Sequence, residues 1–270
     1  MSAEAVKRTW QTWVLFAAIG LGAGFFSGLF GVGGGTIIVP LLIAVAHFDV
    51  RKAAGTSLAA IVPTAVVGVS SYGVRNDVDW LAALLIVVGS VAGAQIGSLL
   101  LHRLPRQAVR LAFIGFLIAV IASLFLVIPA RSSQLSIDFW LGLGLVTLGL
   151  VTGILSGMLG IGGGIVVVPV LIVVFGASDL IAKGTSLAMM VPTALSGTIG
   201  NLRRGNLDLP AAGVIGLAAA GTASFGVVAA AWVDPFVGNV LFAVFLSYLV
   251  ITMSRATVKG LRANAQDAGK

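Results

Sequence analysis

The chain has 270 residues, of which 59% are hydrophobic and only 9% are charged, and its formal net charge is +7. Soluble domains are about 45–50% apolar and about 25% charged, because a surface in contact with water requires charged groups. This composition therefore excludes an ordinary soluble protein, and the absence of cysteine excludes disulfides and thiolate metal sites.

The first apolar segment, residues 13–47, is too long to cross a membrane once. A spanning helix needs roughly 20 mostly apolar residues, whereas residues 13–47 as one helix would measure roughly 52 Å at 1.5 Å per residue. The middle of the segment holds Gly31, Gly33, Gly34 and Gly35, and each glycine weakens a helix by about 1 kcal/mol. We therefore expect a break there, with two part-helices that form a hairpin.

Three ordinary apolar segments follow this hairpin, and the same series then recurs in the second half. The predicted segments are 13–47, 55–73, 80–101 and 109–128, followed by 139–176, 184–200, 209–232 and 236–253. The one polar stretch between the halves, residues 129–138, is predicted to be a linker. The chain is thus divided into an N-terminal tail (1–12), a first membrane repeat (13–128), the linker, a second membrane repeat (139–254) and a C-terminal tail (255–270).

The two halves are an internal duplication with an offset of 129 residues. The run from Gly24 to Gly35 returns from Gly153 to Gly164, and Gly-Thr-Ser-Leu-Ala at 55–59 returns at 184–188. From Gly24 to Trp80, 25 of the 57 positions are identical without a gap. Shared apolar composition does not align Gly, Pro, Thr and Ser in this way, so each half is one copy of the same structural unit.

The distribution of basic residues favours two copies that insert in opposite orientations. If residues 13–47 cross the membrane once, the sixteen Lys and Arg residues divide ten to six between the two sides, and if they double back the division is thirteen to three. The positive-inside rule favours the second arrangement, which leaves only Arg75, Arg131 and Lys183 on the outer side. We therefore predict an all-α integral membrane protein of two inverted repeats, each with a glycine-broken hairpin and three further helices, an arrangement typical of secondary transporters.

The glycine runs at 31–35 and 160–164 do not match a nucleotide-binding loop. No Gly-Lys-Ser/Thr follows them, and Thr36 and Ile165 occupy the third glycine position of a dinucleotide fingerprint. Close helix packing explains the outer glycines, such as Gly24 and Gly28. Broken backbone inside a membrane survives only when it is buried in protein or lines a polar cavity, and free amides at a helix start are suited to binding an oxyanion.

Several polar residues near the breaks are candidates for contact with a substrate. Gly-Thr-Ser at 55–57 and at 184–186 indicates a helix start with a hydroxyl as N-cap, and the doubled hydroxyl suggests that one faces the substrate. Thr64 and Thr193 follow prolines, where a hydroxyl can instead bond to the helix backbone. Lys183 has Ala54 as its repeat counterpart; it is either a lysine that snorkels to the interface or a residue that attracts anions.

The candidate substrate-binding residues are Gly33, Gly34, Gly35, Thr56, Ser57, Thr64, Gly162, Gly163, Gly164, Lys183, Thr185, Ser186 and Thr193. We expect no catalytic residues, no metal site and no cofactor, because no nucleophile–base pair and no metal-binding motif is present. All nine acidic residues lie in loops, tails or span ends. A proton-coupled carrier usually buries a carboxylate within a span, so internal proton coupling is disfavoured.

The doubled Gly-x-x-Ser-Gly-x-x-Gly-x-Gly-Gly-Gly, followed by a proline and then by Gly-Thr-Ser-Leu-Ala, resembles the sulfite exporter TauE/SafE family of bacterial membrane permeases. The resemblance covers about residues 13–254. It implies a multi-pass protein of the bacterial inner membrane that exports sulfite or sulfur-containing organic anions. The expected partners are a small anionic substrate, the lipid bilayer and a second copy of the chain in a homo-oligomer, but no nucleic acid. The alternative is a non-transporting membrane subunit or scaffold of a larger complex.

Overall fold

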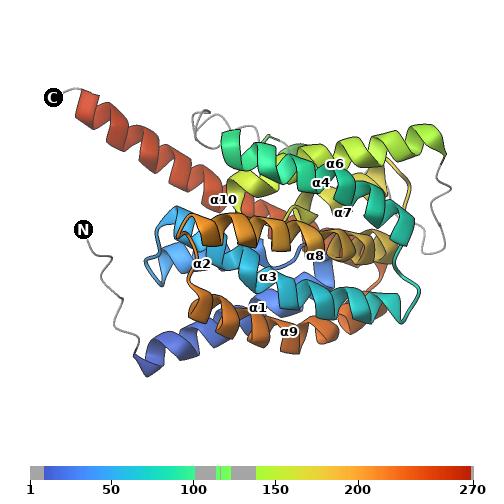
Figure 1. Ribbon diagram of the computed structural model, residues 1–270, viewed down its shortest axis with the longest axis horizontal. Coiled ribbons are helices and arrows are strands. Elements are labelled where there is room, and N and C mark those ends of the chain that lie inside the picture. The colour runs from blue at the N-terminus through green and yellow to red at the C-terminus, as the bar shows by residue number, and fades with distance from the viewer. Residues whose placement is uncertain (1–8, 101–113, 116, 123–137, 269–270) are drawn as a thin grey trace.

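The computed structural model describes residues 9–100, 114–115, 117–122 and 138–268, and regular structure within these ranges is helical throughout. The principal helices are α1 (Trp10–Phe30), α2 (Gly35–Ala44), α3 (Val50–Gly73), α4 (Trp80–Leu100), α6 (Phe139–Leu159), α7 (Gly164–Val173), α8 (Asp179–Arg203), α9 (Leu209–Trp232) and α10 (Pro235–Ala268) (Figure 1). The predicted all-helical membrane fold is confirmed. Most of the predicted span 109–128 and of the linker 129–138 lies outside the described residues, and α10 continues well beyond the span predicted at 236–253.

Each half begins with a helical hairpin broken at its glycine run. In the first hairpin α1 ends where Gly31 adopts a left-handed φ of 71° and donates its N–H to the Ser27 carbonyl, and α2 starts after Gly34 at φ 73°. The second hairpin, α6 and α7, repeats this geometry at Gly160 and Gly163. L-residues rarely adopt such angles, so glycine is required there. The short arms α2 and α7 have 10 residues each, about 15 Å at 1.5 Å per residue, which is half the thickness of the hydrocarbon layer.

The two halves interlock, because the first helix of each packs along the fourth helix of the other. α1 lies against α9, and α6 lies against α4. The seams are built from glycines that touch backbone of the opposite helix: Gly20 with Ile215, Gly24 with Ala219, Gly28 with Ala223, and then Gly149 with Ile86, Gly153 with Ser90, Gly157 with Ala94. Each contact of the second seam is the repeat counterpart of a contact in the first. The number of the glycine increases by 129, and the number of its partner decreases by 129. The duplication is therefore also a structural pseudo-two-fold relation.

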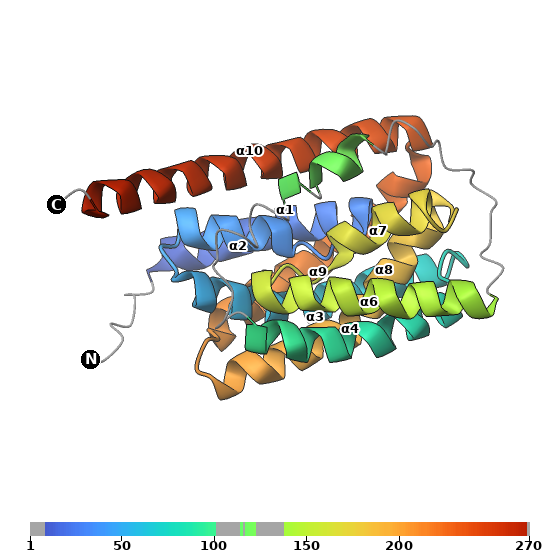
Figure 2. The same ribbon diagram turned by 90° about the horizontal axis from the view of Figure 1, so that it is seen from above.

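The central helices α3 and α8 run in opposite directions, as inverted repeats require (Figure 2). Near the start of α3, Lys52 lies 3.3 Å from a carboxylate oxygen of Asp208, just after the end of α8. Near the start of α8, the Thr185 hydroxyl accepts a hydrogen bond from the Asp79 N–H, just after the end of α3. Arg51 and Lys52 therefore share one end of the molecule with Arg203 and Arg204, while Lys183 lies at the other end.

The outer surface of the bundle is apolar and suited to lipid. Among the described residues, six helical segments are long and apolar enough to cross a membrane: Trp10–Phe30, Val50–Gly73, Trp80–Gly97, Phe139–Gly157, Leu209–Trp232 and Pro235–Thr252. The 25-residue α8 falls outside this set because its polar residues lower its hydropathy. Exposed aromatic residues stand at helix ends, namely Trp10, Trp80, Phe139, Trp140 and Trp232. Aromatic rings at such positions are typical of the membrane–water interface.

The glycine seam gives a direct test of this packing through two glycines of α1. A Cβ at Gly24 would collide with the backbone of Ala219, whereas a Cβ at Gly22 would meet no atom within 4 Å. We expect Gly24→Ala to lower the stability of the detergent-solubilised protein by about 1–3 kcal/mol, as overpacking does. Gly22→Ala, the matched control, should leave stability unchanged or raise it by up to about 1 kcal/mol through helix propensity. Thermal denaturation followed by size-exclusion chromatography measures both, and equal melting temperatures for the two variants would contradict the seam.

Candidate functional site

The two glycine breaks meet each other at the centre of the molecule. The position that a Cβ of Gly35 would take lies 3.0 Å from the Ile161 carbonyl oxygen, in the second break. Reciprocally, a Cβ at Gly164 would lie 2.7 Å from the Gly31 carbonyl oxygen, in the first break. The starts of α2 and α7 therefore abut the opposite hairpin. Neither start has a side-chain cap, so first-turn amides with partial positive charge face the middle of the protein.

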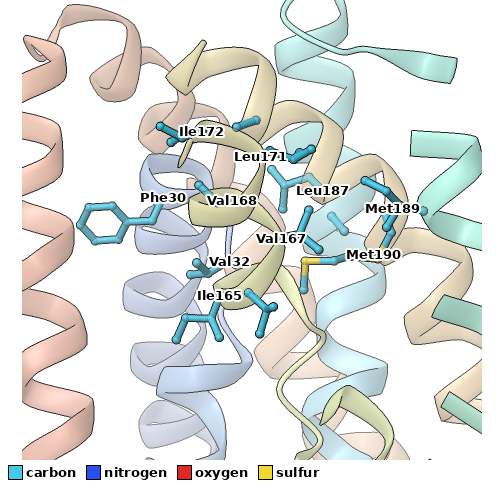
Figure 3. Close-up of a cluster of buried hydrophobic side chains, with 14 of the residues drawn as sticks. Phe30, Val32, Ile165, Val167, Val168, Leu171, Ile172, Leu187, Met189 and Met190 are labelled. Atoms are coloured by element: carbon cyan, nitrogen blue, oxygen red, sulfur yellow. The ribbon is translucent and has the colours of Figure 1, made fainter. Parts of the chain in front are cut away.

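Two apolar side chains occupy the space between the breaks. A Cβ at Gly33 or at Gly162 would collide with the terminal methyl group of Met190, and both lie beside Ile61. Figure 3 shows Met190 reaching from α8 toward the segments that carry Val32 and Ile165. Ile61 and Met190 are repeat counterparts and stand four residues after Ser57 and Ser186, on the same face of α3 and α8. They were not among the residues expected at the site, and this spacing is the signal that could have found them.

Ser57 and Ser186 occupy the same position of the repeated motif, but their hydroxyl groups form different contacts. The Ser186 hydroxyl donates to the Gly31 carbonyl at 2.9 Å and so ties α8 to the first break. The Ser57 hydroxyl, 3.1 Å from the Cβ position of Gly35, is buried and has no hydrogen-bond partner among the described residues. The same is true of the Thr36 hydroxyl, in the first turn of α2, whose repeat counterpart is Ile165. A buried hydroxyl without a partner costs about 1–3 kcal/mol. The first break therefore holds two hydroxyl groups that can still form a hydrogen bond with a ligand.

Further buried hydroxyls without a partner border each hairpin. Ser27 lies in the last turn of α1, and its carbonyl accepts the Gly31 N–H. Thr152 of α6 lies against the second break, since its methyl group is 2.6 Å from the Cβ position of Gly163. In the part of the chain that the structure describes, four of the six buried polar side-chain atoms without partners therefore lie in or beside the hairpins, and the other two, in Asp179 and Thr198, lie on α8.

The expectation that Gly-Thr-Ser starts a helix is wrong in both halves. α3 begins at Val50 with Asp49 as its cap, and α8 begins at Asp179 with Ser178 as its cap. Both helices start five residues before the glycine, because these caps already satisfy the first free amides. The threonines of the motif are therefore available for contacts between the repeats.

Thr56 and Thr185 connect the two repeats to each other. The Thr185 hydroxyl accepts from the Asp79 N–H at 3.0 Å, and the Thr56 hydroxyl accepts from the Asp208 N–H at 3.1 Å. Asp79 and Asp208 in turn cap α4 and α9 through their side chains. In this structure these two predicted site residues position helix starts of the opposite repeat, and their hydroxyls are not directed at the breaks.

Thr64 and Thr193 bond to their own helices. Thr64 donates to the Ala60 carbonyl at 3.0 Å and Thr193 to the Met189 carbonyl at 2.9 Å, each four residues earlier. A proline leaves the carbonyl four residues before it without an N–H donor, and each threonine bonds to the next carbonyl along the chain. The prediction that the threonines compensate for the prolines is therefore wrong, and each makes the ordinary hydrogen bond of a threonine to its own helix. Thr193 also contacts the Ser90 hydroxyl at 2.7 Å and so links α8 to α4.

Lys183 is buried at the tip of the first hairpin. Its Nζ lies 3.3 Å from Oδ2 of Asp179, and a Cβ at Gly31 would lie 2.6 Å from its Cα. With only 8% of its surface exposed, it does not snorkel to the interface, and an acidic neighbour offsets its charge. Asp77 follows the end of α3 nearby. Burial raises the pKa of the Asp77 carboxyl, the Asp179 charge raises it further, and Arg75 opposes the shift.

The structure brings together Gly33, Gly34, Gly35, Ser57, Gly162, Gly163, Gly164 and Ser186 around the two breaks. Thr56, Thr185, Thr64 and Thr193 serve helix contacts, and Lys183 stands beside Gly31. Within the described ranges, no group of three His, Cys, Asp or Glu side chains is arranged to hold a metal ion. The arrangement offers amide and hydroxyl donors in a buried setting, which suits the binding of an oxyanion.

Comparison with known proteins identifies a family. A family model described as "Sulfite exporter TauE/SafE" matches residues 2–124 and 145–269. "Probable membrane transporter protein YunE" of Bacillus subtilis is 26% identical over 222 residues, which cover 73% of this chain and 81% of that protein. YdhB of the same organism, with the same description, is 28% identical over 68% of this chain and 77% of its own length. MJ0441 of Methanocaldococcus jannaschii, another "Probable membrane transporter protein", is 27% identical over 58% and 60%. No solved structure matches.

The threonine contacts between the repeats generate a prediction about stability. Thr185→Val removes the acceptor of the Asp79 N–H, and we expect it to destabilise the protein by about 1–3 kcal/mol, the cost of an unsatisfied buried amide. Thr185→Ser keeps the hydroxyl and should stay close to the wild type. Thermal unfolding in detergent measures the difference. If Thr185→Val melts like the wild type but no longer binds substrate, the hydroxyl faces the substrate and the positioning role is wrong.

Proposed function

The chain belongs to the sulfite exporter TauE/SafE family, and from this premise we propose that it is a secondary transporter that exports small anions across the bacterial inner membrane. The family description names sulfite, and we extend the proposed substrates to sulfur-containing organic anions. The observation that carries the proposal is the meeting of two uncapped helix starts beside buried hydroxyls without partners, inside a bundle with an apolar outer surface.

The chemistry of this meeting point suits an anion better than a cation or a neutral solute. Helix N-termini carry a partial positive charge and present N–H donors. Among the atoms nearest the Cβ positions of the break glycines there is no carboxylate oxygen, and Ile61 and Met190 supply the apolar wall. The amide and hydroxyl donors at the breaks would bind an oxyanion directly. An inside-negative membrane potential favours the exit of an anion that moves alone by about 2.3 kcal/mol per charge per 100 mV.

The space between the breaks is closed by side chains in this structure, which agrees with an occluded state of a carrier. Met190 touches both breaks through its terminal methyl group. A methionine side chain is unbranched and adapts its shape readily, so it can withdraw to admit a small anion. Ile61 is branched and stiffer, and it stands on the opposite repeat. Rocking of one repeat against the other around this point would expose the site alternately to each side.

The difference between the two serines points to the first break as the main contact for the anion. Ser57 and Thr36 have no hydrogen-bond partner among the described residues, while Ser186 is engaged with the Gly31 carbonyl. A substrate oxygen would satisfy the free hydroxyls at the start of α2. Ser186 would instead stabilise the conformation of the first break through its hydrogen bond to the Gly31 carbonyl.

A matched pair of serine variants tests this assignment. Ser57→Ala should weaken anion binding roughly tenfold or more, because a hydrogen bond to a charged group contributes about 1.5–3 kcal/mol. Its thermal stability should stay near the wild-type value, since no protein contact is lost. Ser186→Ala should lower the melting temperature, because the Gly31 carbonyl loses its donor.

The measurement is protein-dependent flux of sulfite and of sulfonates through liposomes that contain the purified chain, with phosphate and acetate as comparison anions. Concentration dependence gives the apparent affinity of each variant. Flux in Ser57→Ala with wild-type affinity would remove the first break from the site. Wild-type liposomes without flux, together with stable co-purification of another membrane protein, would support a scaffold instead and overturn the proposed transport.

A further inference from the structure

A buried ion pair at the start of α8 is not used by the proposed anion site. Asp179 and Lys183 stand one helical turn apart, with Nζ 3.3 Å from Oδ2, and their exposed fractions are only 3% and 8%. The second carboxylate oxygen, Oδ1, is buried and has no hydrogen-bond partner among the described residues. A buried carboxylate normally fills both oxygens with donors. In Asp179, Oδ1 remains able to accept a hydrogen bond.

Lys183 lies beside the first glycine break, at the end of the molecule opposite Arg51 and Lys52, and Asp179 precedes it by one helical turn. Lys183 contacts Gly31 through its main chain, and three residues later Ser186 donates to the Gly31 carbonyl. On the other flank, the Tyr72 hydroxyl donates to the Gly28 carbonyl at 2.7 Å, in the last turn of α1. The tip of the first hairpin is therefore enclosed by α3, by α8 and by this ion pair.

The corresponding position at the second break has no such pair. The repeat counterparts of Asp179 and Lys183 are Val50 and Ala54, and Ala54 occupies beside Gly160 the place that Lys183 occupies beside Gly31. The counterparts of Tyr72 and Asp77 are the neutral Asn201 and Asn206. A structural role common to both halves would place similar groups at both ends. Charged groups at one end only indicate a role in which the two sides of the membrane differ.

The charges around Asp179 determine how its carboxylate responds when Lys183 changes partner. Its own helix supplies Lys183, and Tyr72 of α3 and Asp77 in the connection after α3 lie within electrostatic reach of it. Arg75 acts on both Tyr72 and Asp77. Removing one partner from a buried ion pair leaves an uncompensated charge, which is strongly unfavourable. Near a second carboxylate, Asp77, and away from water, a carboxylate without its cation is neutralised most readily by a proton.

We propose that Asp179 is a proton-binding site linked to the anion site, so that an anion which takes Lys183 as its counter-ion displaces Asp179, and Asp179 binds a proton. This inference rests on the proposed anion transport. The proton enters from the aqueous side to which the site is open and leaves with the anion on the other side. Asp179 is then a carboxylate again and pairs with Lys183. A monovalent anion thus crosses together with one proton and no net charge moves, so the anion's own concentration gradient and the pH gradient, and not the membrane potential, drive this step.

This proposal departs from the expectation drawn from the sequence, which disfavoured internal proton coupling. Asp179 is the first residue of α8, where an acidic residue ordinarily stabilises a helix start in water. Asp179 is nevertheless only 3% exposed, and Tyr72 of α3 lies within electrostatic reach of it. Its burial is therefore a property of the tertiary structure.

The test uses the full chain in liposomes with methanesulfonate and sulfoacetate as probes, because their sulfonate groups do not titrate near neutral pH. With the wild type, a pH gradient imposed without a membrane potential should drive accumulation of methanesulfonate. A pH-sensitive dye trapped in the lumen should report proton entry with the anion. Asp179→Asn should lose at least tenfold of the gradient-driven accumulation while it retains anion exchange across the membrane, since exchange requires no release of the proton.

Two variants serve as controls at neighbouring and opposite positions. Lys52→Gln removes the ion pair at the other end of the molecule, where the lysine is 42% exposed, and should leave the coupling intact. Asp77→Asn removes the nearby carboxylate and should reduce proton entry only in part, because Asp179 still binds the proton.

Methanesulfonate flux in the wild type that responds to membrane potential but not to a pH gradient would overturn the proton site and leave anion transport standing. Loss of coupling in Asp77→Asn with retention in Asp179→Asn would transfer the role to Asp77 and equally overturn the proposal. If the wild type moves neither probe and does not move sulfite, the proposed function itself fails.

Discussion

The fold depends on one constraint, which is that a broken helix inside a membrane must have its exposed backbone enclosed by protein. Each glycine hairpin reaches the centre of the bundle, and the helix that encloses its tip comes from the other repeat. Lys183 and Ser186 of α8 contact Gly31, and Ala54 of α3 contacts Gly160. Neither half satisfies this requirement alone. The interlocked seams of α1 with α9 and of α4 with α6 result from it.

The pseudo-two-fold relation determines the architecture of the molecule. Where the two halves depart from this relation, the two ends of the molecule carry different chemical groups. The glycine seams, the threonine links to Asp79 and Asp208, and the apolar pair Ile61 and Met190 occur in both halves. Thr36, with Ile165 as its counterpart, and the Asp179–Lys183 pair occur in one half only. A symmetric scaffold rocks equally toward both sides of a membrane. An unequal pair of breaks allows the affinity for a transported solute to differ between the two sides.

The centre of the protein combines tight packing with polar groups that lack partners. Side chains close the space between the breaks, yet Ser27, Thr36, Ser57 and Thr152 remain buried without a hydrogen bond among the described residues. Such groups raise the free energy of a closed state relative to one in which water or substrate reaches them. A carrier needs this balance, because a fully satisfied core would hold a single conformation.

The sequence by itself determined the membrane location, the duplication, the position of both helix breaks and the opposite orientation of the halves. Composition, the 129-residue offset, the glycine runs and the distribution of basic residues are local or periodic properties, and no knowledge of tertiary contacts is needed to recognise them. The tertiary structure decided which polar residues face the breaks. Thr56 and Thr185 bond to helix starts of the opposite repeat, and α3 and α8 begin five residues before the Gly-Thr-Ser motif because Asp49 and Ser178 cap them. Likewise, Tyr72 of the first repeat comes within electrostatic reach of the buried Asp179 of the second repeat only when the two repeats interlock.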